Sequence, residues 1–300
     1  MRPLERPLFM AYFPAMTTAS SQRILQSSLS LAQSHYENFP VASALLPLRL
    51  RQPVSLIYTF ARQADDFADE GNLLPEERLA LLDNYRRQLD RIAAGIKSET
   101  EFFSTLEEMI HSHQLPLQPF YDLLEAFSQD VVKPRYENFG EVMNYCRRSA
   151  NPIGRLMLHL YDATTPRNLG YSDAICSALQ IINFLQDVAI DYGKNRIYLP
   201  LDELRLYRVN EAQIARGDAG GTWPNFIQFQ IERARKLLQA GAPLGLVLQG
   251  RIGLEMRTII AGGEIILKKL HRHHGDMFEH RPILKPWDWG YMLYRAVRAK

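Results

Sequence analysis

Apolar residues recur three and four positions apart along most of this chain, the pattern of helices that bury one face. Proline opens several of these segments and glycine closes them, as at Pro53 and Gly71. Strict alternation of apolar and polar residues, which would predict strands, is nearly absent. The expected helices cover residues 53–70, 75–94, 98–113, 117–131, 140–160 with an interruption at 151–152, 172–191, 202–207, 223–238, 252–270 and 287–299.

The segments between these helices are short, and they contain no internal repeat, low-complexity tract or interdomain linker. Because such helices must bury their apolar faces against one another, the pattern predicts one all-α domain over residues 19–300. Residues 1–18 are expected to form a disordered leader. Arg2 and Arg6 precede a short apolar stretch that resembles a signal peptide, but Pro14 breaks it and no clear cleavage site follows. Translation from Met16 is an alternative.

Composition limits the classes of partner. The 300-residue chain has 35 Lys and Arg against 33 Asp and Glu, a formal charge of +2, which argues against nucleic acid. The chain contains no uninterrupted apolar run of about 18 residues, so a transmembrane helix is not expected. Cys146 and Cys176 lack the spacing of a metal site and lie in apolar helical segments, so we expect buried free thiols rather than a disulfide.

The helix expected over residues 53–70 carries two acidic side chains on one face. Asp65 and Asp69 are four residues apart and therefore project about one turn from each other, and Arg62 can reach the same face. A pair of aspartates at this spacing usually marks a solvated surface. Here Tyr58 and Phe60 are among several aromatic and apolar neighbours, which indicates a helix packed in a core.

A second segment repeats this design with three oxygen-bearing side chains. Asn183, Asp187 and Asp191 fall at every fourth residue of a segment that is otherwise too apolar for a solvated helix. Like charges at this spacing destabilise a helix, and more so when they are desolvated. Two such faces can share one cavity only if cations neutralise them. Carboxylate and amide oxygens without Cys or His favour Mg²⁺, which usually also binds a phosphate of the substrate.

Three blocks of the sequence resemble the squalene/phytoene synthase family. They are YTFARQADDFAD at 58–69, YCRRSANPIG at 145–154 and the segment 183–200, in the expected order and spacing. The likeness extends over about residues 25–298, and segments 35–43, 149–154, 241–245 and 250–255 resemble the hydroxysqualene synthases of bacterial hopanoid pathways. The resemblance implies a helical isoprenoid-synthase bundle around a central cavity. It also implies conversion of presqualene diphosphate and water to hydroxysqualene and diphosphate.

The resemblance also assigns roles by position. The expected Mg²⁺ ligands are Asp65, Asp69, Asn183, Asp187 and Asp191. The expected diphosphate contacts are His35, Arg62, Arg196 and Tyr198. The residues expected to line the cavity are Phe39, Tyr58, Tyr145 and Gln180, and we count Tyr145 with the four aspartates as catalytic. Aromatic faces suit this chemistry because they stabilise a cation without offering a nucleophile, although each ring alone would more simply be core packing.

Two positions depart from the family pattern. Glu37 and Asn38 stand where carotenoid-type synthases commonly carry Ser-Lys, whose lysine helps to hold diphosphate. The absence of this lysine fits a substrate that bears one diphosphate rather than two farnesyl diphosphates. Asn195 replaces the glycine usually found before Arg196, and asparagine tolerates the same left-handed backbone.

Other functions stay open beside the hydroxysqualene synthase prediction. One is a synthase that joins two prenyl diphosphates head to head to give squalene, presqualene diphosphate or phytoene. Another is a non-catalytic helical assembly factor, but such relatives lose the aspartates that are all present here. We expect the apolar stretch 244–248 in the core, although it could help a greasy product to reach a bilayer. The expected location is the cytoplasm, with a peripheral contact to the inner membrane left open.

Overall fold

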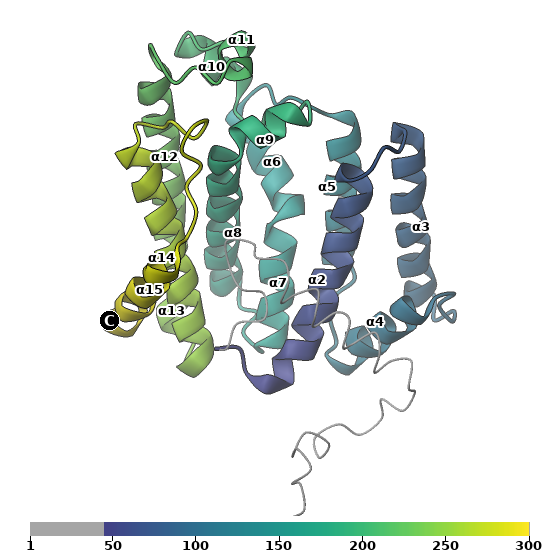
Figure 1. Ribbon diagram of the computed structural model, residues 1–300. Coiled ribbons are helices and arrows are strands. Elements are labelled where there is room, and N and C mark those ends of the chain that lie inside the picture. Colours follow the sequence, from purple (N-terminus) through teal and green to yellow (C-terminus); the bar gives the residue numbers. More distant parts are fainter. Residues whose placement is uncertain (1–44, 300) are drawn as a thin grey trace, which may run out of the picture.

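Long helices packed side by side form the body of the molecule in a computed structural model, which describes residues 45–299 (Figure 1). The prediction of an all-α fold is confirmed. Within these residues no strand occurs, and the only strand-like pairing is a single parallel bridge between Arg135 and Ile197. The expected leader and the start of the predicted domain at residue 19 lie outside the described residues.

The helices follow one another along the chain with short connections. They are α2 (Leu48–Asp69), α3 (Pro75–Ala93), α4 (Glu101–Ser112), α5 (Gln118–Val132), α6 (Phe139–Ser149), α7 (Asn151–Leu160), α8 (Pro166–Gln186), α9 (Val188–Gly193), α10 (Leu201–Leu206), α11 (Glu211–Ala215), α12 (Trp223–Gly241), α13 (Leu244–Val247), α14 (Gly250–Arg272) and α15 (Pro286–Arg298). Every helix expected from the sequence has a counterpart. The short α11 and α13 were not predicted.

The helix boundaries follow the local chemistry of the chain. Gly71 and Gly95 adopt positive φ values of 72° and 65° just after α2 and α3, a conformation that costs glycine little. The predicted start of α8 at residue 172 is wrong by six residues. Thr165 caps this helix instead, because its side chain accepts a hydrogen bond from the backbone N–H of Asn168 at 3.2 Å. Pro166 occupies the first helical position, where the fixed φ angle of proline already suits a helix.

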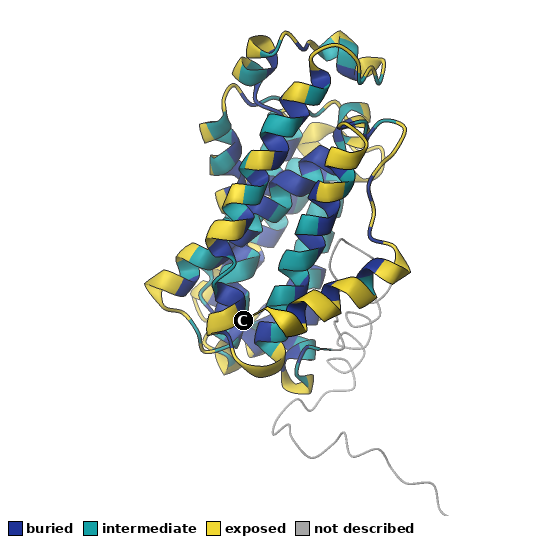
Figure 2. Cartoon of the chain, turned by 90° about the vertical axis from the view of Figure 1, so that its left-hand side faces the viewer, coloured by how far each residue is buried: buried dark blue, intermediate teal, exposed yellow. Residues whose placement is uncertain are grey.

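Two clusters of buried side chains form the core. One gathers α8, α12 and α14, and the other gathers α2 to α5 with part of α7. Tyr161 and Ile252 pack against both clusters, so the two halves belong to one domain. α8 packs against α7 and α12, which explains why it is apolar on more than one side. Figure 2 shows the buried residues on the inward sides of the long helices.

Cys146 and Cys176 are free thiols, as expected, with Cys146 buried and Cys176 half-buried. Burial raises the pKa of Cys146 to about 12 and that of Cys176 to about 11. Both are therefore inert structural thiols at neutral pH. None of the helices between residues 45 and 299 combines the length and apolar character needed to span a bilayer.

Candidate active site

A cavity of about 450 Å³ lies between α2, α7, α8 and α14. Most of its wall is apolar, with Ile57, Met157 and Leu179 among the lining side chains. Six of the residues predicted for the site also line it: Tyr58, Arg62, Asp65, Tyr145, Gln180 and Asn183. The expectation of a central cavity is confirmed.

Of the residues predicted for the site, Arg62, Asp65 and Asn183 lie toward one end of this cavity, whereas Ser172 and Glu255 are polar residues elsewhere in its lining. Along α2 the lining changes from Val54 to Arg62 and Asp65, and along α8 it changes from Ile175 to Asn183. Both helices run toward the end of the bundle where α9 lies (Figure 1). A chamber whose wall is mostly apolar and which carries Arg62, Asp65 and Asn183 at its α9 end fits an amphiphilic molecule with a long hydrocarbon part and an anionic head.

The two acidic faces meet near this polar end. Asp69 ends α2, Asp187 stands between α8 and α9, and Asp191 lies on α9. Burial raises the pKa of Asp191 to about 8, and the negative charges of Asp187 and Asp69 add to this effect. Asp69 is more than a hundred residues away in sequence, so its influence on Asp191 shows that the two helix faces are close in space.

The helix predicted over residues 172–191 is interrupted at Asp187, so a continuous helix was wrong. Asp187 has φ −109° and ψ 16°, and α9 starts at the next residue. The backbone N–H of Asp187 still donates to Asn183 at 2.9 Å, and that of Asp191 donates to Asp187 at 2.8 Å. The three side chains therefore keep their spacing of one turn. Like charges one turn apart disfavour a regular helix, and the distortion falls at the first aspartate of the pair.

Basic side chains from outside the acidic helices partly neutralise them. Asp69 forms ion pairs with Arg196 and with Lys194, the latter at 2.8 Å. Burial acts to raise the pKa of Asp69, but the bond from Lys194 and the charge of Arg196 outweigh it and lower this pKa. Asp187 pairs with Arg281 at 2.5 Å. On α2 itself, Arg62 forms ion pairs with Asp66 at 2.8 Å and with Asp65 at 3.8 Å.

Lys194 and Arg281 were not predicted. Lys194 lies in the segment 183–200, three residues after Asp191. Helical spacing could therefore have indicated that it lies near the acidic face. Arg281 comes from the loop between α14 and α15 and is distant in sequence from every acidic segment. Gln186 also contacts this loop, because its side-chain amide donates to the carbonyl oxygen of Pro282 at 2.7 Å. No pattern in the sequence indicated that this loop reaches the site.

Asp130, a buried aspartate that was not predicted from the sequence, connects Tyr145 and Tyr198. The hydroxyl of Tyr145 donates to one carboxylate oxygen of Asp130 at 2.6 Å, and that of Tyr198 donates to the other at 2.8 Å. Burial raises the pKa of Asp130 to about 6 and raises the pKa of both phenols well above their ordinary value. Asp130 follows the buried Leu123 and Phe127 at helical spacing, which placed it on the core face of its helix.

Tyr198 lies away from the cavity lining, although it was expected to contact diphosphate. Its ring stacks on Phe184 with centroids 4.0 Å apart and rings nearly parallel, and its hydroxyl is bonded to Asp130. Tyr145, by contrast, lines the cavity. Asn195 has φ 60°, so the left-handed backbone expected at this position is confirmed. His35 and Phe39, together with Glu37 and Asn38, lie outside the described residues.

The donor set at the polar end fits Mg²⁺ in its chemistry. Asp65, Asp69, Asn183, Asp187 and Asp191 offer only hard oxygen atoms, the ligands that Mg²⁺ prefers. The raised pKa of Asp191 marks negative charge that a cation would relieve. These aspartates do not bring three ligand atoms within 4.8 Å of one another in the described part of the chain.

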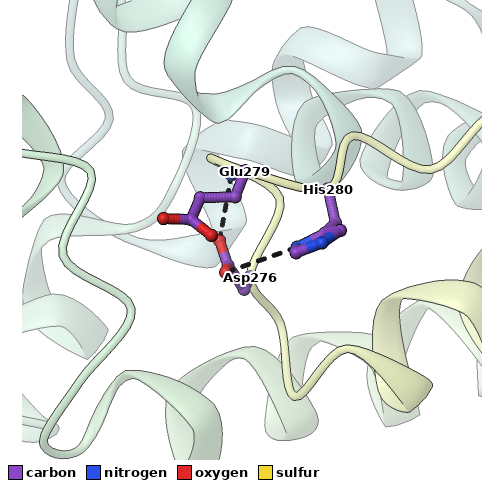
Figure 3. A group of neighbouring side chains, drawn as sticks. All are labelled: Asp276, Glu279 and His280. Carbon is purple, nitrogen blue, oxygen red and sulfur yellow. Dashed lines mark hydrogen bonds and ion pairs between the residues drawn. The ribbon is translucent and has the colours of Figure 1, made fainter.

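One group in residues 45–299 does meet that distance: Asp276, Glu279 and His280, in the loop after α14 (Figure 3). His280 Nδ1 lies 3.6 Å from one oxygen of Asp276, whose other oxygen accepts the backbone N–H of Glu279 at 3.1 Å. Glu279 and His280 are exposed, and none of the three lines the cavity. These contacts fold the loop on itself, which is enough to explain the group.

Comparison with known proteins supports the resemblance seen in the sequence. The family model described as squalene/phytoene synthase matches residues 32–288. A hydroxysqualene synthase from Rhodopseudomonas palustris is 35% identical over 277 residues, which cover 91% of this chain and 92% of that protein. A phytoene synthase from Arthrospira platensis is 30% identical over 287 residues, 91% of each chain.

The solved structure of the squalene synthase HpnC from Alicyclobacillus acidocaldarius has the same fold. Its TM-score is 0.78 at 32% identity, over 86% of this chain and 96% of that one. The family match over residues 32–288 includes the helices that surround the cavity and both acidic faces. With the fold, the cavity and the sequence relatives in agreement, this chain belongs to the squalene/phytoene synthase family.

Proposed function

We propose that the chain is a Mg²⁺-dependent hydroxysqualene synthase that converts presqualene diphosphate and water to hydroxysqualene and diphosphate. The observation that carries this proposal is the cavity with an apolar wall and one polar end, beside which two acidic faces meet. The likeness to the Rhodopseudomonas palustris hydroxysqualene synthase favours this product over the alternatives.

Binding of the substrate follows from the polarity of the cavity. The hydrocarbon chains would lie along the apolar wall, where Ile57, Met157 and Leu179 exclude water. The diphosphate would lie at the polar end, within reach of Arg62 and of Arg196 and Lys194, which pair with Asp69. Bound at the oxygen-rich faces, Mg²⁺ would neutralise the diphosphate as it leaves.

The reaction itself needs a charged leaving group and a protected cation. The bond between carbon and the diphosphate oxygen breaks, and its electron pair leaves with diphosphate. The resulting carbocation rearranges and forms a new bond to the oxygen of a water molecule, which then releases a proton. The ring of Tyr145 at the cavity wall can stabilise the cation, while its raised pKa keeps the hydroxyl protonated and poorly nucleophilic.

No nicotinamide cofactor enters this reaction, and the chain has no glycine-rich GxGxxG loop. That absence alone decides little, because relatives that use NADPH also lack this loop. A role in hopanoid biosynthesis and a cytoplasmic location remain predictions of the resemblance.

The test is incubation of the purified full-length chain with presqualene diphosphate, Mg²⁺ and ¹⁸O-water, followed by mass spectrometry of the product. We expect hydroxysqualene with the label in its hydroxyl group. Efficient condensation of farnesyl diphosphate alone, or squalene formed only with NADPH, would assign the chain to the head-to-head synthases instead. Absence of turnover with every prenyl diphosphate would leave a non-catalytic helical protein.

A further inference from the structure

Helix α15 carries an unusual number of exposed apolar side chains. Of its 13 residues, five are large, apolar and exposed: Trp287, Tyr291, Leu293, Tyr294 and Val297. Trp287 is 68% exposed. Figure 2 shows this helix across the lower front of the molecule, with most of its turns exposed. Scattered exposed apolar residues are ordinary, but a concentration on one helix marks an interaction surface.

The exposed aromatic residues lie opposite the side by which α15 packs. Its buried residues Asp288, Met292 and Ala296 are four apart and form a narrow stripe, and α14 is the helix it packs against. Trp287 and Tyr294 are seven residues apart and therefore share one face of the helix. At 3.6 residues per turn, this face lies opposite the buried stripe. A helix that is apolar on both sides is normally covered on both.

The exposed charges on this helix and on the residue that precedes it are all positive. Lys285, Arg295 and Arg298 are exposed, whereas Asp288, the only acidic residue between 283 and 299, is buried and paired with Lys269. Lys285 Nζ lies 5.2 Å from the centre of the Trp287 ring, and the guanidinium carbon of Arg298 lies 5.0 Å from that of Tyr294. Each of these aromatic rings is thus flanked by a cation.

Helix α13 extends the same surface. Leu246 and Val247 are exposed, and Leu246 lines a groove between α13, α14 and α15 together with Tyr291 and Arg295. Glu264 also lines this groove, but it is paired with Arg235 at 3.3 Å. α13 and α15 lie near the end of the bundle opposite α9 (Figure 1).

The exposed surface of α13 and α15 lies next to the end of the cavity that is remote from Arg62 and Asp65. Leu244 of α13 lines the cavity, and Leu246 of the same short helix lines the groove. On α14, Met256 lines the cavity and Arg257 lines the groove. A single layer of helix separates the cavity from the exposed apolar surface.

We propose that α13 and α15 dock this protein onto the surface of an anionic lipid bilayer. Trp and Tyr combine an apolar ring with a polar group and favour the membrane interface, while Lys and Arg attract anionic headgroups. A second copy of the chain is disfavoured as the occupant, because a symmetric contact would bring these positive charges face to face. The inference does not depend on the proposed reaction, since it concerns binding alone.

The test uses the full-length chain and vesicles of phosphatidylcholine, alone or mixed with phosphatidylglycerol. We expect sedimentation with the mixed vesicles only, and release as salt screens the charges. Tryptophan fluorescence should shift to shorter wavelength and be quenched by brominated lipid. Trp223 is fully buried and Trp289 is half-buried, so the exposed Trp287 should contribute most of this change, and Trp287→Ser should remove most of it. A wild-type chain that binds neither kind of vesicle would overturn the proposal.

The decisive variant carries Trp287→Ser and Tyr294→Ser, and its matched control carries Leu74→Ser and Leu206→Ser. The control residues are also exposed, at 63% and 75%, but they lie elsewhere on the molecule. We expect at least about a tenfold loss of vesicle affinity for the first variant only, with equal thermal stability for both. Equal loss in the control would overturn the proposal. So would a wild-type dimer that the first variant converts to a monomer, because the surface would then bind protein.

Discussion

The hydroxyl of Tyr145 donates a 2.6 Å hydrogen bond to the buried carboxylate of Asp130, which links the wall of the cavity to the core of α5. Tyr198 donates to the second oxygen of the same carboxylate at 2.8 Å. One aspartate thereby holds two aromatic rings, and only one of them lines the cavity. Asp130 is a positioning residue, because it acts through Tyr145 and does not itself line the cavity.

Asp130→Asn should change how stability depends on pH. Folding raises the pKa of this carboxyl from 3.8 to about 6, so the folded state binds its proton more tightly than the unfolded state does. The wild type therefore loses stability relative to the asparagine variant as pH rises from about 4 to 6, by up to about 3 kcal/mol, and the difference is constant above that range. Urea denaturation across this range measures the effect.

The control for this prediction is Asp83→Asn, on the exposed side of α3, where the side chain is well solvated. Its stability relative to the wild type should stay nearly constant over the same pH range. If Asp130→Asn and Asp83→Asn gave parallel curves, burial of the Asp130 charge would not be the cause.

Removal of divalent metal should abolish turnover, and addition of Mg²⁺ should restore it. Asp69, Asp187 and Asp191 repel one another at the polar end of the site, and an anionic diphosphate would add to this repulsion. Mg²⁺ should also raise the melting temperature without substrate, because it relieves the repulsion in the folded state only. Full activity after exhaustive chelation would contradict the proposed mechanism.

Asp187→Asn should separate activity from stability. We expect turnover to fall by about 100-fold or more through the loss of a metal ligand, while the melting temperature changes little. The variant loses the partly exposed pair with Arg281, worth about 0–1 kcal/mol, but it also loses the repulsion from Asp191. The control is Asp173→Asn, which breaks the 2.7 Å pair with Arg155 outside the cavity and should leave turnover intact.

Much of this fold could be predicted because apolar spacing alone determines which segments are helices. The site aspartates of α2 and of the segment that joins α8 to α9 were found for the same reason, since a helix places every fourth residue on one face. Boundaries were less accurate, as at Thr165, where a side-chain cap extends α8 by six residues beyond the apolar pattern. Tertiary contacts could not be predicted from helical spacing, because Arg281 and Asp130 approach the site only after the chain folds.

Burial was also only partly predictable. The stretch 244–248 was expected in the core, and Leu244 and Leu248 are indeed buried, but Leu246 and Val247 are exposed. Periodicity predicts that a helix has an apolar face without stating which neighbour covers it. The same limit applies to α15, whose second apolar side was not distinguished from core.

Gly154→Ala should destabilise the contact between α7 and α8. A Cβ atom at Gly154 would lie 2.3 Å from Ser172 Oγ and 2.6 Å from Cys176 Sγ, so either these two side chains must rotate away or α7 and α8 must move apart. Overpacking of this kind costs about 1–3 kcal/mol.

Gly170→Ala is the matched control, because this exposed glycine of α8 has nothing within 4 Å of the position that a Cβ atom would take. That variant should gain about 0.5–1 kcal/mol from helix propensity. Thermal and urea denaturation of both variants measure the two effects, and because Gly154 lines the cavity, its variant should also bind substrate less well. Equal stabilisation of both variants would show that α7 and α8 can move apart without cost.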